Sequence, residues 1–517
     1  MARPPAGSGM ASWGDKDRRD DRRAGDAAPV TGRAFRRVLS GLRRTVLGRI
    51  VPHERMGRWR YVARGVVAGV PVFIGVFLAS LLLSVIEPFG LGAATRAHSE
   101  RITARVLAPF YRSEAQDQIA VILIDDATLE HEGLAWPPRY SDYEVLLRRV
   151  LAHQPRAIYV DILMEQRRDY DASFEDAHEA LHEAIADASR SERLGGGTIP
   201  VFFGVSAPGR ASIFSTPGAI EDVVTSWQGA GDQYPVTIAG DRINEAAVSA
   251  GADGADHRSV ALALYDAACP DGGAPGCVQP ASHLSSPARA DAMAVQWGWQ
   301  RPVLADARGI ECVRSSAASV PERWADAMRL ALQSLVSGVY RDAEERGRSR
   351  CPYTLTLFAE QLADGALLRD GTAPAVLEDR VVLIGTHLLG LDDRVPSPVH
   401  QTIPGVYLHA MALDNLMIWG QDRVRSVRGA GVAIDVLLAL LLSLVVGFLR
   451  ADDGMARRWR LLGLLLLPLL AVGVVMLAQW LWRQPPQDWI GMTLLVLMAA
   501  GYVLGRGNQT WNGDGSS

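Results

Sequence analysis

The sequence predicts an α/β domain with a mainly parallel mixed sheet, carried by four transmembrane α-helices, one before the domain and three after it. Two observations predict this class. Four long apolar stretches stand near the two ends of the 517-residue chain, and a strand–helix–strand pattern opens the more polar region between them. A chain of this length exceeds one compact domain, so several structural units are expected.

Each apolar stretch is close to the ~20 residues that cross the hydrocarbon core of a bilayer. The predicted spans are 65–86, 429–449, 461–482 and 489–505. The first begins too far into the chain and is too long for a cleaved signal peptide. The lipid bilayer is therefore an expected partner.

Arginine predicts the orientation of these spans. Residues 1–64 form a basic, partly disordered tail with 16 Lys plus Arg against 6 Asp plus Glu. The loop 450–460 is also rich in arginine, so both segments are expected in the cytoplasm. Arg423, Arg425 and Arg428 oppose this orientation but are fewer. Both termini, including the short tail 506–517, are then cytoplasmic, and the domain 87–428 lies outside.

Charge excludes several functions. The net charge of −4 gives no basis for bulk nucleic-acid binding. Lys16, in the basic tail, is the only lysine. The folded regions therefore lack the lysine of a P-loop, of a kinase ATP site or of a Schiff base. No cofactor is expected.

All four cysteines fall within 87–428. An even number in an oxidising compartment favours disulfides, although four cysteines permit three connectivities. We favour Cys269–Cys277 and Cys312–Cys351. A zinc site is less favoured because neither pair has C-x-x-C spacing.

The outer domain opens with a βαβ pattern. The strand "QIAVILID" is followed by the helix "SDYEVLLRRVLAHQ" and the strand "AIYVDI", which predicts parallel neighbours joined by a right-handed crossover. A helix "DASFEDAHEALHEAIADASR" and the strands "TIPVFFG" and "RVVLIG" follow. Residues 206–302 are rich in Gly, Ala, Ser and Pro, which predicts an irregular insertion.

Acidic residues follow two of these strands. Asp125 and Asp126 end the first strand and Asp161 the second, while Arg139 opens the crossover. Ligands of parallel sheets bind beyond the carboxyl ends of strands, so this cluster could hold a small polar ligand or a cation. The favoured interpretation is structural: Asp126 caps the next turn and Arg139 pairs with a carboxylate. No catalytic residue is assigned.

The segment "HEALH", His178 to His182, has the H-E-x-x-H pattern of zinc proteases. Leu181 and Ile185 continue an apolar helix face, and no acid stands at a usual third-ligand distance. We therefore assign no metal site, and keep a zinc hydrolase as an alternative function.

Three further residues are candidates. His409 has helical spacing with apolar residues and is expected to be a core histidine, hydrogen-bonded within the domain. His387 follows the strand "RVVLIG" and so faces the strand-end side, as a ligand or pH-sensing candidate. Asp435 lies within the second span, near its outer end, where it could contact another span and carry a signal between helices.

Two blocks give the domain a resemblance to a known family. The first is "VILIDDATLEHEGLAWPPRYSDYEVLLRRVLAHQPRAIYVDILM", with Asp125-Asp126, Trp136-Pro137, Arg139 and Asp161. The second is "RVVLIGTHLLGLDDRVPSPVHQTIPGVYLHAMALDNLM", with Ile384-Gly385, Asp392, Pro404-Gly405-Val406, His409 and Asp414-Asn415. Together with the order of spans, they resemble the second type of CHASE domain, an extracellular sensory module associated with cyclases and histidine kinases.

The resemblance implies a bacterial inner-membrane sensor with a periplasmic domain. Its expected ligand-sensing residues are Asp125, Asp126, Arg139, Asp161, His387 and Asp392. Members of the family usually continue into a cytoplasmic output domain, for which the tail "RGNQTWNGDGSS" is too short. We therefore expect no enzyme activity and a separate signalling partner, contacted through Arg33–Arg64 or Arg450–Arg460. A homodimer and an envelope scaffold without a ligand are also possible.

Overall fold

The computed structural model of the chain describes most of the domain and the helices that flank it. The described residues are 56–86, 91–111, 113–190, 198–207, 209–225, 233–235, 237–238, 257–271, 274–283, 292–298, 312–313, 319–336, 349–350, 352–363, 376–391, 393–423, 430–451, 457–482 and 488–509. Most of the basic tail, Asp392, Cys351 and the side chain of Cys312 lie outside this set. Contacts divide the chain into Met1–Ala63 and Arg64–Ser517, and the domain and its flanking helices from Arg64 onward belong to the second unit.

A six-stranded sheet forms the centre of the domain. Its order is β11-β1-β12-β2-β3-β4, and every pairing in it is parallel. The strands are β1 (Ile119–Asp125), β2 (Ala157–Val160), β3 (Val201–Val205), β4 (Ile220–Val224), β11 (Leu355–Phe358) and β12 (Val381–His387). Their near-continuous burial is the pattern of a sheet covered on both faces.

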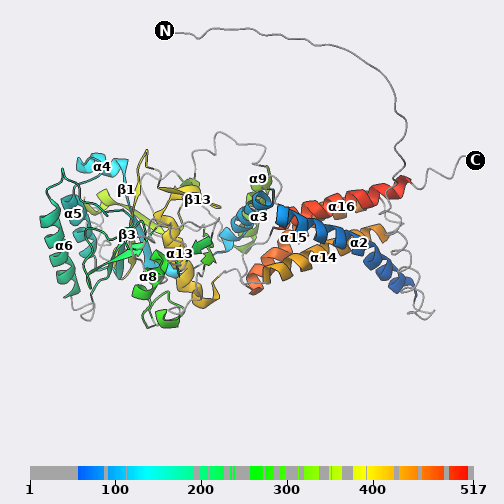
Figure 1. The fold of residues 1–517 in the computed structure, drawn as a ribbon, viewed down its shortest axis with the longest axis horizontal. Helices are drawn as coiled ribbons and strands as arrows, with labels where there is room; N and C mark the ends of the chain where they lie inside the picture. Colours follow the sequence, from blue (N-terminus) through cyan, green and yellow to red (C-terminus); the bar gives the residue numbers. More distant parts are fainter. Residues whose placement is uncertain are drawn as a thin grey trace, which may run out of the picture. The chain divides into compact units, whose positions relative to one another are not determined.

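Helices cover both faces of this sheet (Figure 1). On one face, α13 (Val406–Trp419) packs on alternate residues of β1 and β12, such as Val121 and Leu383, and α8 (Val260–Ala268) packs on β2 and β4. On the other, α5 (Tyr140–Leu151) and α6 (Phe174–Ser189) pack on the intervening residues, such as Ile122 and Ile384. The strand side chains alternate between the two cores.

The remaining described elements are short or lie at the edges of the domain. The helices are η2 (Ala108–Phe110), η3 (Glu114–Gln118), α4 (Asp126–Glu132), η6 (Ala281–His283), α9 (Val320–Val336), α10 (Ala359–Ala363) and η8 (Gly420–Asp422). Four two-stranded pairs are β5 (Gln233–Pro235) with β8 (Ala292–Ala294), β6 (Thr237–Ile238) with β7 (His257–Arg258), β9 (Cys312–Val313) with β10 (Ser349–Arg350), and β13 (Arg394–Ser397) with β14 (Gln401–Pro404).

Two expectations from the sequence need correction. The strands β1 and β2, expected as neighbours, are separated by β12, which pairs with both. The segment 206–302, expected to be irregular, supplies β4 to the main sheet and the buried helix α8. The first error arises because strand order depends on contacts between distant segments, which local periodicity does not report. The second arises because β4 and α8 are short and stand among residues rich in Gly, Ala, Ser and Pro.

Apolar helices flank the domain on both sides in the sequence: α2 (Met56–Ile86) before it, and α14 (Ala430–Ala451), α15 (Arg457–Trp482) and α16 (Trp489–Gln509) after it. Among the described residues, three stretches are long and apolar enough to cross a membrane: Tyr61–Ser80, Gly431–Ala451 and Trp459–Leu481. The apolar part of α16, Trp489–Gly501, is shorter. Buried side chains of all four helices share one hydrophobic cluster, and α3 (Leu91–Leu107) connects α2 to the domain.

Candidate functional site

Asp125 and Asp126 lie at the carboxyl end of β1, and each has a structural partner. The Asp125 carboxylate is the N-cap of α4 and accepts from the Thr128 backbone N–H at 2.8 Å and its hydroxyl at 2.6 Å. The sequence suggested that Asp126 caps this helix, and that expectation is wrong. The Asp126 carboxylate accepts from the Leu389 backbone N–H at 2.9 Å, which fastens the loop after β12 to α4.

His387 ends β12, where its Cα pairs with that of Asp125. The Arg394 guanidinium lies 3.2 Å from His387 Nε2, and because a guanidinium only donates, this nitrogen accepts. Burial, with the charge of Arg394, lowers the pKa of His387, while the Asp125 and Asp126 carboxylates oppose that effect. His387 is therefore expected to be neutral at pH 7.

Asp161 follows β2 on the sheet face that α13 covers. Its Oδ1 accepts from the Tyr159 hydroxyl at 2.7 Å and from the Thr225 hydroxyl at 3.0 Å, and lies 4.0 Å from His409 Nε2. Thr225 directly follows β4. The carboxyl ends of two strands and a helix thus meet at one carboxylate.

His409, in the first turns of α13, is the buried member of this group and is 4% exposed. Its Nδ1 lies 2.8 Å from the Tyr234 hydroxyl and its Nε2 3.2 Å from the Thr225 hydroxyl. Burial lowers the pKa of His409, and the Asp161 carboxylate opposes this. We call Asp161, Thr225, Tyr234, Asp393 and His409 the strand-end cluster.

Asp393 completes the cluster beside the first turn of α13. Desolvation and the nearby Asp161 charge raise the pKa of Asp393 to about 6, and a hydrogen bond from Thr386 opposes them. A Cβ on Gly405 would stand 2.6 Å from Asp393 Oδ1, so any other residue here would displace this carboxylate. A Cβ on Gly385 would likewise meet Val406 Cβ at 2.6 Å. These glycines of the second sequence block let α13 approach the sheet.

Of the six predicted ligand-sensing residues, Asp161 is the only described one that belongs to this cluster; Asp125, Asp126 and His387 make the separate contacts given above. Arg139 is exposed and precedes α5, which covers the opposite face of the sheet from α13. Its backbone N–H donates to Asp142, and no ion pair joins its side chain to another described residue. Asp392 lies outside the described residues. Asp393, its neighbour, was missed although the acidic pair is visible in the sequence.

Thr225 and Tyr234 were also missed. Both fall in the segment that the sequence assigned to an irregular insertion, where no periodic pattern marked them. Tyr159 could have been found, because it lies two residues before Asp161 in a strand and so shares its face of the sheet.

His178 and His182 of the "HEALH" segment both contact the hydroxyl of Thr216. His182 Nε2 lies 2.7 Å and His178 Nε2 3.4 Å from Thr216 Oγ1. No third His, Cys, Asp or Glu joins them among the residues that the structure describes. The exposed Glu179 does not complete a ligand set, so this arrangement does not support the zinc hydrolase alternative.

The far end of α13 is joined to the membrane helices by side-chain amides. Asn415, fully buried, donates to the Tyr111 hydroxyl at 2.9 Å and to the Gln296 carbonyl at 3.0 Å, and accepts from the Gln296 N–H at 2.7 Å. The Gln296 side chain accepts in turn from Gln479 of α15 at 2.6 Å. The Tyr111 hydroxyl also donates to Asp414 at 3.3 Å. We call Tyr111, Gln296, Asp414, Asn415 and Gln479 the junction network.

A second polar junction links α3 to the start of α16. Asp488 accepts from the Thr95 hydroxyl at 2.7 Å and the Ser99 hydroxyl at 3.1 Å, and the Trp489 indole N–H donates to the Ser99 carbonyl at 3.3 Å. One turn and a half further along α3, Arg105 donates to the carbonyl of Pro398 at 2.6 Å. Pro398 lies between β13 and β14, the hairpin that follows Asp393.

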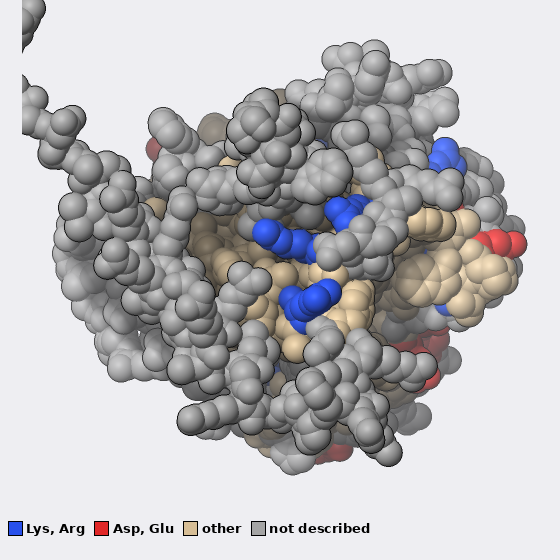
Figure 2. Space-filling view, turned by 90° about the vertical axis from the view of Figure 1, so that its right-hand side faces the viewer, with Lys and Arg blue, Asp and Glu red and all other residues tan. Residues whose placement is uncertain are grey.

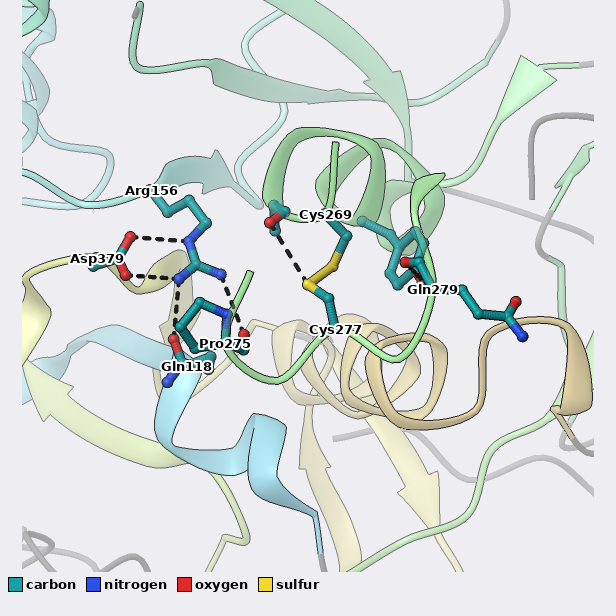
Figure 3. Close-up of a disulfide and its surroundings, with 9 residues drawn as sticks. Gln118, Arg156, Cys269, Pro275, Cys277, Gln279 and Asp379 are labelled. Carbon is teal, nitrogen blue, oxygen red and sulfur yellow. Dashed lines mark hydrogen bonds and ion pairs between the residues drawn. A yellow bond between two sulfur atoms is a disulfide. The ribbon is translucent and has the colours of Figure 1, made fainter. Parts of the chain in front are cut away.

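The predicted disulfide Cys269–Cys277 is confirmed and holds a loop against the end of α13 (Figure 3). The Val278 N–H in this loop donates to the Met417 carbonyl at 2.8 Å. Figure 3 also shows Arg156, which pairs with Asp379 and donates to Gln118 and to the Pro275 carbonyl. The Cys312–Cys351 pair lies outside the described side chains.

Arginines gather at the other end of the membrane helices. Gly65 of α2 contacts Phe448 of α14, and Gly463 of α15 lies against Leu449. Arg64, Arg450 and Arg460, each within three residues of these contacts, therefore stand at one end of the bundle. Figure 2 shows basic side chains gathered over apolar and neutral residues on this face. Asp435 lies half-buried in the second turn of α14, and no partner hydrogen-bonds its Oδ1 among the described residues.

The fold and its contacts define an α/β domain with a buried polar cluster at one edge, joined to helices apolar enough to cross a membrane. The model of the CHASE2 domain family matches residues 72–449. The chain therefore belongs to this family, whose members are extracellular sensory domains of signalling proteins, as the two sequence blocks suggested. No curated protein and no solved structure matches the chain.

Proposed function

We propose that this protein is a bacterial inner-membrane sensor. Its periplasmic domain would bind a small ligand or register an envelope stimulus at the strand-end cluster, and a separate cytoplasmic partner would supply the output. Both termini would lie in the cytoplasm. The observation that carries this proposal is the position of α13, which holds His409 of the cluster in its first turns and is bonded in its last turns to Gln296, which is bonded in turn to Gln479 of α15.

The helix α13 has 14 residues, which is about 21 Å at the rise of an α-helix. Its first turns hold His409 and pack Gly405 against Asp393. Its last turns hold Asp414 and Asn415 in the junction network, which ends on Gln479 of α15. A shift or tilt of this helix at one end would therefore strain hydrogen bonds at the other.

A parallel connection runs through the β13–β14 hairpin. It begins beside Asp393 and reaches Arg105 through the Pro398 carbonyl, and α3 then holds Asp488 at the start of α16. A change at the strand-end cluster would thus reach α15 through α13 and α16 through α3. Two connections from one site favour a role in signalling over a purely structural one.

The cluster also favours a polar stimulus. It combines a carboxyl group with a pKa near 6, a neutral buried histidine and two hydroxyls, so it suits a small polar or cationic ligand, or a proton. A ligand shifts the arrangement of the spans only by its difference in affinity for two states. Asp125, Asp126 and His387, along the same edge, would form the outer part of the site.

Distances between spans test the proposal. Nitroxide labels at Val432→Cys on α14 and Leu494→Cys on α16, both exposed positions, would report the arrangement of the helices in nanodiscs. We expect the distance distribution to change between pH 7.5 and 5.5, and Asp161→Asn to remove that change. Distributions that respond to neither pH nor this substitution contradict a coupling from the cluster to the spans.

The partner requires a separate experiment. Mild crosslinking of the full-length protein in its native membrane, followed by mass spectrometry, should recover a cytoplasmic kinase, cyclase or similar enzyme. Crosslinks should map to the face that carries Arg64, Arg450 and Arg460. Recovery of envelope components alone would contradict this proposal and favour a scaffold.

A further inference from the structure

The helix α9 presents an apolar stripe that the domain leaves uncovered. Val320, Trp324 and Met328 are 58%, 50% and 55% exposed. A step of four residues turns an α-helix by about 40° beyond a full turn, so the three side chains lie along one side. Ala327 and Arg323, which adjoin this stripe on the side of Val320, are buried. The helix thus has one face fixed to the protein and a second, apolar face open.

The exposed stripe lies apart from the charged face of the helix. Glu322 and Arg329 are both exposed, and the helical period places them on the side away from Val320 and Trp324. A helix with an apolar stripe and a charged opposite side is typical of segments that lie in the plane of a membrane surface.

The buried face of α9, which carries Ala327, is continuous with the core of the membrane helices. Ala327 belongs to the hydrophobic cluster that also contains Val72 of α2, Leu438 of α14 and Met492 of α16. The Trp324 ring stands 4.8 Å from the ring of Phe110, which follows α3, and α9 lies beside α3 (Figure 1). Since α3 holds Asp488 at the start of α16, α9 sits where the domain meets the spans.

We infer that α9 lies on the outer surface of the bilayer, with Val320, Trp324 and Met328 inserted at the boundary between headgroups and acyl chains. Tryptophan is enriched at this boundary because its ring is apolar and its N–H polar. The inference rests on the membrane-spanning role of α2, α14 and α15. It goes beyond the sensor proposal, because it gives the lipid surface a direct contact with the sensory domain.

Nitroxide accessibility tests this contact in the full chain. A label at Met328→Cys, in liposomes of phosphatidylethanolamine and phosphatidylglycerol, should collide more with oxygen, which concentrates in lipid, than with a water-soluble nickel chelate. The matched control is Arg329→Cys, one residue further on, which should favour the nickel chelate. We expect the oxygen-to-nickel ratio to differ several-fold between the two positions. The chain without an added cysteine must take up no label.

Each alternative gives another result. High nickel accessibility at Met328 would place the stripe in water and overturn the inference. Exclusion of both reagents would show protein over the stripe and overturn it as well. If spin–spin broadening then vanished on dilution with unlabelled chains, the covering partner would be a second copy. Val320→Cys repeats the measurement on the same stripe, so that a misfolded Met328→Cys chain does not leave the question open.

Discussion

The two ends of α13 are both polar, yet their chemistry differs. The junction network is buried, whereas Asp393 of the strand-end cluster is exposed. At the strand-end cluster, ionisable groups face one another: Asp161 lies 4.0 Å from the neutral His409, and its charge also acts on Asp393. At the junction network, the amides of Asn415 and Gln296 make complementary hydrogen bonds. Groups near their pKa change charge with small changes in surroundings, whereas matched amides hold one geometry. The strand-end cluster is therefore suited to respond, and the amide pair of the junction network to transmit, while Asp414 beside that pair is ionisable as well.

The largest effect is expected from Asn415→Ala at the junction network. The substitution removes the partner of the Gln296 N–H and carbonyl and of the Tyr111 hydroxyl, all of them buried. Unsatisfied buried groups cost about 1–3 kcal/mol each, so we expect the free energy of unfolding to fall by about 3 kcal/mol. Urea unfolding in nanodiscs measures this. The control is Gln166→Ala at an exposed position, which should change the free energy of unfolding by less than about 0.5 kcal/mol. If both variants lost the same free energy, the buried hydrogen bonds of Asn415 would not account for the loss.

The disulfide comes next, because it fixes the loop that holds the end of α13. Replacing Cys269 and Cys277 by serine frees a short loop, which should cost about 2–3 kcal/mol. The thermal midpoint of the oxidised protein should fall. A reducing agent should then destabilise the parent chain and have a smaller effect on the double variant. An unchanged midpoint would show that this loop does not support α13.

Gly385→Ala tests the packing of the first turn of α13 against β12. The new methyl would stand 2.6 Å from Val406 Cβ, so the helix must shift, at a cost of about 1–3 kcal/mol. The span-to-span distances should change together with stability. Gly75→Ala, in α2 with nothing within 4 Å of the new Cβ, is the control and should leave both unaltered. If stability changed and the span-to-span distances did not, the packing of α13 on β12 would not be coupled to the arrangement of the spans.

The pH dependence of stability should have opposite signs for Asp414 and His409. Burial raises the pKa of Asp414 to about 7, above its value of about 3.9 in the unfolded chain. The folded state holds this proton more tightly, so Asp414 makes the free energy of unfolding fall as pH rises from about 4 to 7. The pKa of His409 is lowered, so acid below about pH 6.5 protonates the unfolded chain first and lowers stability.

Asp414→Asn and His409→Gln should therefore change the slope of stability against pH in opposite directions. Each slope is at most about 1.4 kcal/mol per pH unit. Unfolding of both variants from pH 4.5 to 8 measures it. Slopes that shift in the same direction would contradict the assignment of protons at the two ends.

The smallest effect concerns a part of the domain away from α13. His178→Ala with His182→Ala should lower the free energy of unfolding by about 1 kcal/mol, since the pair loses its contacts to Thr216. Zinc should bind neither the parent nor the variant stoichiometrically. A bound zinc that the double substitution removes would revive the hydrolase alternative.

The sequence predicted the local elements well. Apolar runs marked β1, β2, β3 and β12, and a helical period marked α5 and α6, because these are the buried parts of a sheet covered on both faces. It could not predict that β12 separates β1 from β2, since strand order is decided by packing between segments more than 200 residues apart.

The candidate site shows the same division. Asp161 and His409 were both singled out, but nothing local indicated that they face each other. Thr225 and Tyr234 have no pattern around them at all, and only the fold brings them to Asp161. Gly385 and Gly405 were visible as parts of a family block. The reason why glycine stands at both positions, the close approach of α13, required the structure.

The central place of β12 has a consequence for how the protein is made. Strand β1 cannot complete its pairing until residues 381–387 arrive, and these come shortly before the span that begins at Ala430. Contacts so distant in sequence form late and slowly. In the proposed topology, a chain synthesised from its amino end must therefore hold an unfinished sheet, with open strand edges, through most of its translocation. Assembly of the sheet and insertion of α14 become nearly simultaneous events, and chaperones of the receiving compartment would act on the chain before both.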